Sequence, residues 1–227
     1  MLGAPHDFIG WLACSDRGVP RNRGVHVGDG PPGGGLRRGV LRAEDGNDLA
    51  PDIRSALHGR TNLNVQRLTT DGLHLADALG KPSELGGTPL IDHTFDWEGD
   101  LVEAPWMVKR EGFYYLFYSS FSYCDGRYAV GVARARSPVG PFTKNPSARP
   151  IFTSGNGFDG PGHGSAVSGP GAKDGLFFVY HAWKAGQTCN QPGSARQVLV
   201  DAVSWSKQAS DGGAWPTING GHPSGAR

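Results

Sequence analysis

The sequence predicts an all-β protein assembled from repeated blades of short antiparallel strands. Among its 227 residues are 36 glycines and 17 prolines, so turns cut the chain into short pieces. No stretch has the hydrophobic period of an amphipathic helix of useful length. Part of the chain also repeats itself at a constant offset, which a β-sandwich, the alternative all-β architecture, does not predict.

The repeat lies in the C-terminal half of the chain. The segment GFYYLFY at 112–118 matches the segment GLFFVYH at 175–181, position for position. A short strand with a lone polar residue precedes each copy, Glu103 in the first and His163 in the second, and a strand rich in Val and Ala follows. Repeats of three or four short strands without helices are typical of propeller blades.

Alternating apolar residues and flanking turn residues predict the individual strands. The expected strands are residues 62–68, 101–109, 113–120, 128–135, 176–183 and 196–203, with a further strand in GSAVSG at 164–169. The turns are marked by Thr70-Asp71-Gly72, by the Arg-Glu-Gly at 110–112 and by SPVGPF at 137–142. We therefore divide the chain into an irregular segment at 1–42 and a partial propeller at 43–227, with blades at about 43–95, 96–155 and 156–224.

The segment at 17–42 differs from the rest, because most of it is Arg, Gly or Pro. It has no period and too few large apolar residues to offset the entropy of ordering. We interpret the segment as a disordered linker, a damaged blade or a misread piece of gene. No aromatic residues interleave with its arginines, so a single-stranded RNA contact is not favoured.

Charge and hydropathy exclude several classes of partner. The 22 basic and 21 acidic residues nearly cancel, so no strong field recruits nucleic acid or an anionic membrane. No apolar run approaches the roughly 20 residues that span a bilayer. The N-terminal stretch MLGAPHDFIGWLACSD has no basic region before a broken apolar run, so no signal peptide is visible.

Three cysteines, Cys14, Cys124 and Cys189, form no CxxC pair, so a structural zinc site is not expected. Two interpretations stay open. A disulfide between Cys124 and Cys189 would suit a secreted protein and leave Cys14 over. Alternatively, the three are unrelated thiols.

Two polar residues are candidates for chemistry. Glu103 stands in an apolar strand beside Trp106, surroundings that favour the proton-carrying form of a carboxyl, although a surface glutamate beside a turn would have the same spacing. His163 lies between glycines that permit close backbone approach, which suits a crowded channel or a metal, while a structural histidine is the alternative. No GxSxG motif supports acyl transfer.

Four ordered motifs add a family resemblance. They are LVEAPWMVKREGFYYLFYS (101–119), YAVGVARARSPVGPFTK (128–144), GPGHGSAV (160–167) and the closing RQVLVDAVSW with GAWPTINGGHPS (196–205 and 213–224). Together they resemble the later blades of the five-bladed propellers of glycoside hydrolase family 43, which comprises arabinanases, α-L-arabinofuranosidases and β-xylosidases. The resemblance covers about 97–224 well and 44–75 loosely.

The resemblance implies roles for individual residues. Glu103 matches the general acid of the family, and His163 matches a channel histidine that in many members binds a calcium or sodium ion, often through water. Arg196 resembles an arginine that reaches the catalytic centre, and residues 123–128 occupy a loop that borders the sugar subsites. We therefore expect Trp106, Tyr123, Arg127 and Arg196 to contact substrate, with no cofactor required. A monomeric, secreted enzyme with an oligo- or polysaccharide substrate is implied.

The implied reaction is inverting hydrolysis of arabinose- or xylose-containing plant polysaccharide. A general acid protonates the leaving oxygen, an aspartate base activates water, and a second aspartate orients the acid. The base belongs to the family's first blade, which we expect this N-terminally truncated chain to lack. Asp29 and Asp45 are the nearest candidates for the second aspartate. The alternative is therefore an inactive propeller that binds carbohydrate or serves as an interaction scaffold.

Overall fold

The computed structural model describes residues 8–9, 39–44, 62–68, 75–76, 88–170, 175–189 and 191–225 of the chain. Its elements are, in chain order, β1 (Phe8–Ile9), β2 (Gly39–Glu44), β3 (Asn62–Leu68), β4 (Leu75–Ala76), β5 (Thr88–Asp92), η2 (Asp96–Glu98), β6 (Val102–Arg110), β7 (Phe113–Ser120), β8 (Ala129–Ala135), β9 (Thr143–Lys144), β10 (Phe158–Ser168), β11 (Leu176–Lys184), β12 (Arg196–Trp205), β13 (Pro216–Ile218) and η3 (Asn219–Gly221). The two helical elements, η2 and η3, are single 3-10 turns. In the part of the chain that is described, no helix is long and apolar enough to cross a membrane.

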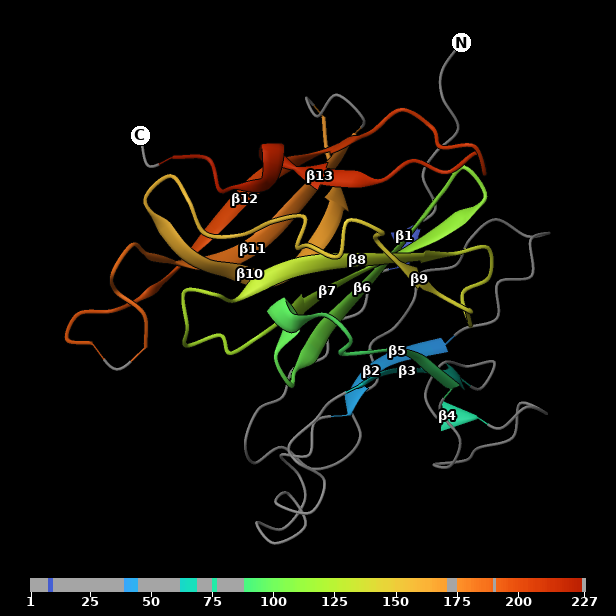
Figure 1. Cartoon of the computed structure of the whole chain (residues 1–227), viewed down its shortest axis with the longest axis horizontal. Coiled ribbons are helices and arrows are strands. Elements are labelled where there is room, and N and C mark those ends of the chain that lie inside the picture. The colour runs from blue at the N-terminus through green and yellow to red at the C-terminus, as the bar shows by residue number, and fades with distance from the viewer. Residues whose placement is uncertain are drawn as a thin grey trace, which may run out of the picture.

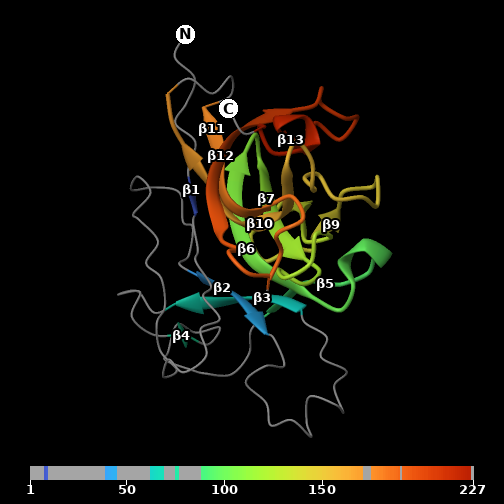
Figure 2. The same cartoon turned by 90° about the vertical axis from the view of Figure 1, so that its left-hand side faces the viewer.

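The strands form three antiparallel sheets (Figure 1). The first sheet has the order β2-β3-β4, with β5 also paired to β3. The second sheet has the order β1-β6-β7-β8-β9, and the third has the order β10-β11-β12-β13. Figure 2 shows the third sheet curling around the second, with the first sheet below them. Each sheet is twisted and short, as expected of antiparallel strands joined by tight turns.

The internal repeat is a structural repeat. β7 lies between β6 and β8 in the second sheet, and β11 occupies the same place between β10 and β12 in the third. The glycines that open the two copies, Gly112 and Gly175, both have left-handed backbone, with φ of 78° and 70°. Glycine adopts this conformation without the steric cost that other residues incur. The two sheets are therefore built by the same strand order and the same turn before their second strand.

The local sequence pattern did not predict the strands that form by pairing with a distant strand. β1 pairs with β6, and β2 pairs with β3 along its whole length, although β1 and most of β2 fall in residues 1–42, which were expected to be irregular. Strand formation depends on the neighbouring strand more than on intrinsic preference, so such short strands leave little signal in the sequence. The remainder of residues 1–42, including Cys14 and Asp29, and also Asp45, lie outside the described residues.

Aromatic side chains fill the space between the second and third sheets. All eight residues of β7 are buried, which is why its sequence is largely aromatic instead of alternating. Phe117 lies 5.6 Å from Phe178, ring centre to ring centre, and Phe152 meets Tyr180 edge to face at 4.8 Å. Burying one such side chain contributes about 1.5–3 kcal/mol. This core fixes the two sheets against each other.

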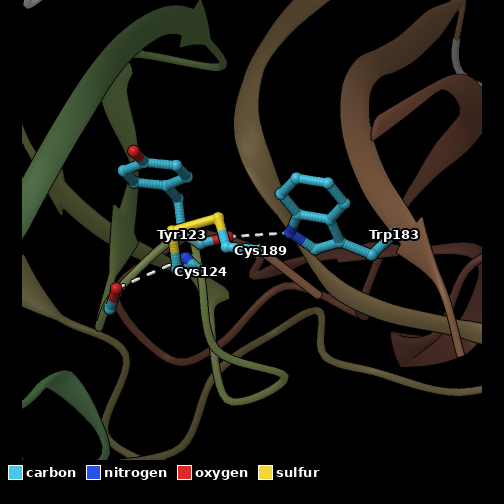
Figure 3. Close-up of a disulfide and its surroundings, with 5 residues drawn as sticks. Tyr123, Cys124, Trp183 and Cys189 are labelled. Carbon is cyan, nitrogen blue, oxygen red and sulfur yellow. Dashed lines mark hydrogen bonds between the residues drawn. A yellow bond between two sulfur atoms is a disulfide. The ribbon is translucent and has the colours of Figure 1, made fainter. Parts of the chain in front are cut away.

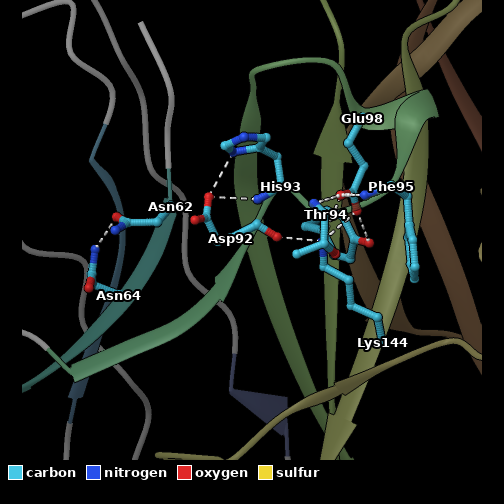
Figure 4. A network of polar contacts seen from close by, with 9 residues as sticks. Asn62, Asn64, Asp92, His93, Thr94, Phe95, Glu98 and Lys144 are labelled. Carbon is cyan, nitrogen blue, oxygen red and sulfur yellow. Dashed lines mark hydrogen bonds and ion pairs between the residues drawn. The ribbon is translucent and has the colours of Figure 1, made fainter. Parts of the chain in front are cut away.

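A buried ion pair joins η2 to β9 (Figure 4). The carboxylate of Glu98, which has no exposed surface, lies 2.6 and 2.7 Å from the ammonium of Lys144. It also accepts hydrogen bonds from the hydroxyl of Tyr118 at 2.6 Å and from the backbone N–H groups of Thr94 and Phe95. Burial lowers the pKa of Lys144, while the charge of Glu98 opposes this shift. The buried charges are thus fully compensated, as a stable buried pair requires.

A C-terminal segment is clamped onto the second sheet. The guanidinium of Arg134, which is 8% exposed, donates to the carboxylate of Asp211 at 2.6 Å and to the carbonyl of Ala214 at 2.9 Å. The hydroxyl of Tyr115 donates to the same carbonyl at 2.9 Å. The guanidinium carbon also lies 4.1 Å from the ring centre of Trp215, a cation–π distance. The clamp therefore combines charge, hydrogen bonds and ring contact.

Candidate active site

Glu103 lies on β6, in the second sheet, where the strand is irregular. It pairs with Ser119 on β7, and the register shifts between Glu103 and Trp106. The next residue, Ala104, has a left-handed φ of 51°. An extra residue in one strand bends it and re-aims the adjacent side chain, an arrangement common beside functional sites. The side chain of Glu103 is 14% exposed, so solvent reaches it only in part.

His163 lies at a matching irregularity on β10, in the third sheet. The register shifts between Gly162 and Ser165, and His163 itself has a φ of 49°. Its backbone N–H donates to the Oγ of Ser119 at 2.8 Å, and its Nδ1 lies 3.8 Å from the Oε1 of Glu103. The two residues selected from the sequence repeat are therefore brought together where the two sheets meet.

Tyr128, just before β8, holds the Glu103 carboxyl. Its hydroxyl donates a hydrogen bond to Glu103 Oε1 at 2.5 Å, and the whole residue has no exposed surface. Burial and, next, the charge of Glu103 raise the pKa of the Tyr128 phenol well above its ordinary value, so it remains a donor. Gly162 makes room for it, because a Cβ there would lie 2.3 Å from Tyr128 Cε1.

His181, on β11, lies behind Tyr128. The two rings stack with centres 5.8 Å apart and planes 5° apart, and the ring of His163 lies 6.3 Å from that of His181. Both ring nitrogens of His181 are buried and have no hydrogen-bond partner within the described part of the structure. Burial, followed by the positive charge of Arg196, lowers the pKa of His181 to about 4. The ring is therefore neutral at neutral pH.

Aromatic residues and an arginine form the rim of the site, and Figure 3 shows the two aromatic residues, Tyr123 and Trp183, beside a disulfide. The guanidinium carbon of Arg196 lies 5.4 Å from the ring of Tyr123 and 5.8 Å from that of Trp183. The indole N–H of Trp183 donates to the backbone carbonyl of Tyr123 at 2.8 Å. A disulfide joins Cys124 to Cys189, so of the two interpretations left open for the cysteines the structure shows the disulfide. It fastens the loop that carries Tyr123, which is 42% exposed, to the loop between β11 and β12.

Trp106 and Arg127, two of the residues expected to contact substrate, make contacts within the protein. Trp106 packs against the aromatic core, and its indole N–H donates to the carbonyl of Ala166 at 2.8 Å. Arg127 is 70% exposed, binds the carboxylate of Asp125 with two nitrogens and lies 4.0 Å above the ring of Phe121. Both residues are thus engaged within the protein. Their contact with substrate stays a prediction.

The described residues do not complete a metal site. No group of three or more His, Cys, Asp and Glu side chains gathers in residues 88–225, apart from the short gaps there, or in the strands described before them. A calcium ion takes six to eight oxygen ligands, whereas His163 offers one nitrogen beside one carboxyl. No catalytic step is therefore derived through a metal ion.

Sequence reasoning missed three contributions to this site: the hydroxyl of Ser119, the phenol of Tyr128 and the ring of His181. Tyr128 was expected only to lie in a loop near the sugar, and not to bind the acid. The repeat offered one usable signal, because His181 takes the position that Tyr118 has in the first copy. The alignment of the two copies could therefore have indicated a histidine in the second strand of a blade, facing the polar residue of the first strand.

The sequence that builds this site also matches a known protein family. A family model described as glycosyl hydrolases family 43 matches residues 47–210. The chain belongs to glycosyl hydrolase family 43. The predicted resemblance is therefore confirmed. The match includes Glu103, Tyr128, His163, His181 and Arg196, so the whole candidate site of this family 43 chain lies within it.

Relatives of known structure support the same fold. A thermostable family-43 glycoside hydrolase is 27% identical, with a TM-score of 0.62 over 83% of this chain and 55% of that one. An endo-1,4-beta-xylanase from Bacteroides thetaiotaomicron is 28% identical, with a TM-score of 0.52 over 72% of this chain and 55% of that one. The predicted fold class, an all-β protein of the propeller family, is confirmed.

One curated protein also matches. The beta-D-galactofuranosidase xynD of Aspergillus niger is 39% identical over 82 residues, which are 35% of this chain and 23% of that protein. The family 43 chain therefore spans about half the length of the two structures above, and its match covers 23% of the curated relative.

Proposed function

We propose that the chain is a glycosidase that hydrolyses O-glycosidic bonds in arabinose- or xylose-containing plant polysaccharides, with Glu103 as the general acid. The observation that carries the proposal is the setting of Glu103. Its carboxyl is 14% exposed, receives a hydrogen bond from the phenol of Tyr128 at 2.5 Å and lies beside His163. A carboxyl held in place and partly withdrawn from water suits proton delivery to a bound substrate.

The rim supports a carbohydrate substrate. Tyr123 offers an exposed ring, and Arg196 lies between it and Trp183. Sugar rings present flat C–H faces that pack against aromatic side chains, and a guanidinium donates several hydrogen bonds in a fixed plane to hydroxyl oxygens. Tyr123 lies on the loop between β7 and β8, and Arg196 begins β12, where its charge acts on Tyr128 and His181 beside Glu103.

The proposed reaction is inverting hydrolysis. Glu103 gives its proton to the glycosidic oxygen as the bond from that oxygen to the anomeric carbon breaks. Water attacks the anomeric carbon from the opposite face, and a second carboxylate takes the proton that the water loses. In inverting enzymes the two carboxyl groups lie about 6.5–9.5 Å apart, which leaves room for the water. Asp29 and Asp45 remain candidates for an accessory carboxylate that orients the acid.

A galactofuranoside is a second candidate substrate. The curated relative from Aspergillus niger is named a beta-D-galactofuranosidase, and the endo-1,4-beta-xylanase from Bacteroides thetaiotaomicron is named for xylan. Galactofuranose and arabinofuranose share a five-membered ring, whereas the xylose of xylan has a six-membered one. The candidate substrates therefore differ in ring shape, which the site can distinguish.

A panel of glycosides tests the proposal. Purified chain is incubated with linear arabinan, xylan and the 4-nitrophenyl glycosides of α-L-arabinofuranose, β-D-xylopyranose and β-D-galactofuranose. We expect turnover of at least one of them, with inversion seen by proton NMR of the first-formed anomer. Glu103→Gln should abolish hydrolysis of the polysaccharide. Hydrolysis of the polysaccharide that survives in Glu103→Gln would refute the role of this residue.

The alternative is a chain that binds carbohydrate without hydrolysing it. In that case titration calorimetry with arabinan or xylan oligosaccharides would show binding, and no reducing ends would appear on prolonged incubation. Tyr123→Ala should weaken carbohydrate binding in either case, because it removes the exposed ring. Only an enzyme would also lose rate.

Four accessory properties are part of the proposal. The disulfide between Cys124 and Cys189 supports a secreted protein, because such bonds persist in oxidising compartments. We further propose a monomer that needs no cofactor. A calcium or sodium ion near His163 is proposed as an optional addition. Dialysis against a chelator followed by activity measurement would detect calcium, and exchange of the buffer sodium for potassium would detect sodium.

A further inference from the structure

We propose that Tyr128 is a positioning residue for the acid: its phenol occupies Glu103 Oε1 and leaves Oε2 to carry and deliver the proton. The inference rests on the proposed function and adds to it a residue that acts through Glu103. Tyr128 OH donates to Oε1 at 2.5 Å, at the short end of hydrogen bonds between two oxygens. An oxygen that accepts so close a donor is the poorer place for the acid's own proton.

A chain of three hydrogen bonds supports this direction of donation. The backbone N–H of His163 donates to Ser119 Oγ at 2.8 Å. A backbone N–H can only donate, so the Ser119 oxygen accepts there and its own hydrogen is free to point to the phenol oxygen of Tyr128, with which it is hydrogen bonded. The phenol hydrogen is then directed to Glu103. The first bond of the chain cannot reverse, and a Ser119 hydroxyl that donates to the phenol leaves the phenol hydrogen for Glu103.

The surroundings keep the phenol in this position. Tyr128 has no exposed surface, its ring stacks on His181, and the absence of a side chain at Gly162 lets β10 lie against the ring edge. Because the ring is enclosed, its hydroxyl cannot turn to solvent as a surface tyrosine's would. Tyr128 can thus hold one carboxyl oxygen throughout a catalytic cycle.

The protein contains a matched control for this contact. Tyr118 is also buried, and its hydroxyl donates to Oε1 of a glutamate, Glu98, at 2.6 Å. That pair lies at the junction of η2 and β9 and serves the buried ion pair with Lys144. Tyr118→Phe therefore removes the same kind of hydrogen bond as Tyr128→Phe without touching Glu103.

The first test compares substrates that differ in their need for an acid. A 4-nitrophenolate departs readily without protonation, whereas a sugar alkoxide does not, and general acid catalysis is worth about 10²–10⁴-fold. On arabinobiose or xylobiose, Tyr128→Phe should lower kcat about 10–100-fold with little change in KM. On the 4-nitrophenyl glycoside of the same sugar, the loss should be below about threefold. Tyr118→Phe should change both rates by the same factor.

The second test does not depend on activity. Urea unfolding of wild type, Tyr128→Phe, Glu103→Ala and the double variant forms a cycle. We expect the double variant to lose less stability than the two single variants together, because each removes the same hydrogen bond. Strict additivity would show that the two groups do not interact and would overturn the inference.

The outcomes separate the inference from the proposed function. If the wild type is active and Tyr128→Phe slows both kinds of substrate equally, the positioning role is wrong and the glycosidase remains. If the wild type hydrolyses nothing in the panel, the proposed function fails and the catalytic role of Tyr128 fails with it.

Discussion

The carboxyl of Glu103 and the imidazole of His163 lie 3.8 Å apart, although they belong to different sheets and are distant in the chain. Each stands at a break in the register of the first strand of its repeat. The same irregularity in two copies therefore turns two polar side chains toward one point. The pair defines the centre of the site.

Replacing His163 should affect rate more than folding if the new residue suits its backbone. His163 has a left-handed φ of 49°, which Asn tolerates better than Ala. We expect His163→Asn to lower kcat/KM about tenfold or more, equivalent to about 1.4 kcal/mol of transition-state stabilisation. His163→Ala should in addition lose about 1–2 kcal/mol of stability. Steady-state kinetics and urea unfolding of both variants would check this, and equal stabilities would contradict the strain argument.

Reducing the disulfide should loosen the rim. Cys124 and Cys189 are separated by 65 residues, and cross-linking a loop of that size stabilises a protein by about 4 kcal/mol in the chain-entropy model. Cys124→Ser should therefore lower the melting temperature strongly. It should raise KM more than it lowers kcat, because Tyr123 lies next to the bond, whereas Glu103 is held by Tyr128. A variant with unchanged KM would show that the loop keeps its position without the bond.

The buried histidine predicts a loss of stability in mild acid. The pKa of His181 is lowered from 6.5 to about 4 in the folded protein, so the unfolded chain takes up the proton first as pH falls. Stability from this group is full above about pH 6.5 and declines toward pH 4, by about 3 kcal/mol in total. His181→Phe keeps a ring against Tyr128 but cannot titrate. Urea unfolding at pH 7 and pH 4.5 should show a smaller difference for this variant than for wild type.

Space at one glycine controls the contact to the acid. A Cβ at Gly162 would lie 2.3 Å from Tyr128 Cε1, so Gly162→Ala should displace the ring and weaken its bond to Glu103. Overpacking of this kind typically costs about 1–3 kcal/mol. Gly225→Ala is the control, because its nearest contact would be an ordinary 3.8 Å. We expect activity to fall in Gly162→Ala only, and comparable losses in both variants would count against this account.

The buried ion pair should matter for stability and the exposed one should not. Lys144→Met would leave the fully buried Glu98 without its cation, a change that costs about 3–5 kcal/mol. Arg127→Met removes a pair whose arginine is 70% exposed, and should change stability by less than about 1 kcal/mol. Denaturant midpoints of the two variants would compare them directly. Similar values would mean that Glu98 finds another partner.

The sequence could predict the strands whose signal lies in their own residues and in the turns beside them. β3 and β7 have the predicted bounds, and β11 and β12 begin where expected, because aromatic and β-branched residues between turn residues mark them. β5, β9 and β13 were not predicted. They are short and are defined by pairing with a strand elsewhere, which no local window contains.

The candidate site was predictable to a similar degree. Glu103 and His163 stand out because each is a lone polar residue in an apolar strand, and the structure brings them together. The bond from Tyr128 to Glu103 was not predictable, since it depends on a bulge and on the glycine that lets β10 approach. Nothing in the sequence around the tyrosines marks which of them contacts the acid.

The clamp between Arg134 and the C-terminal segment has a consequence for how the protein is made. The carbonyl of Ala214 that receives Tyr115 and Arg134 is translated 99 and 80 residues after them. Until the ribosome has released that segment, the nascent second sheet holds a buried phenol and a guanidinium without their final acceptor. These two hydrogen bonds therefore form only after the segment around Ala214 has been made. A ribosome stalled shortly after Trp205 should present a protease-sensitive β6–β9 region that becomes resistant once Ala214 has emerged.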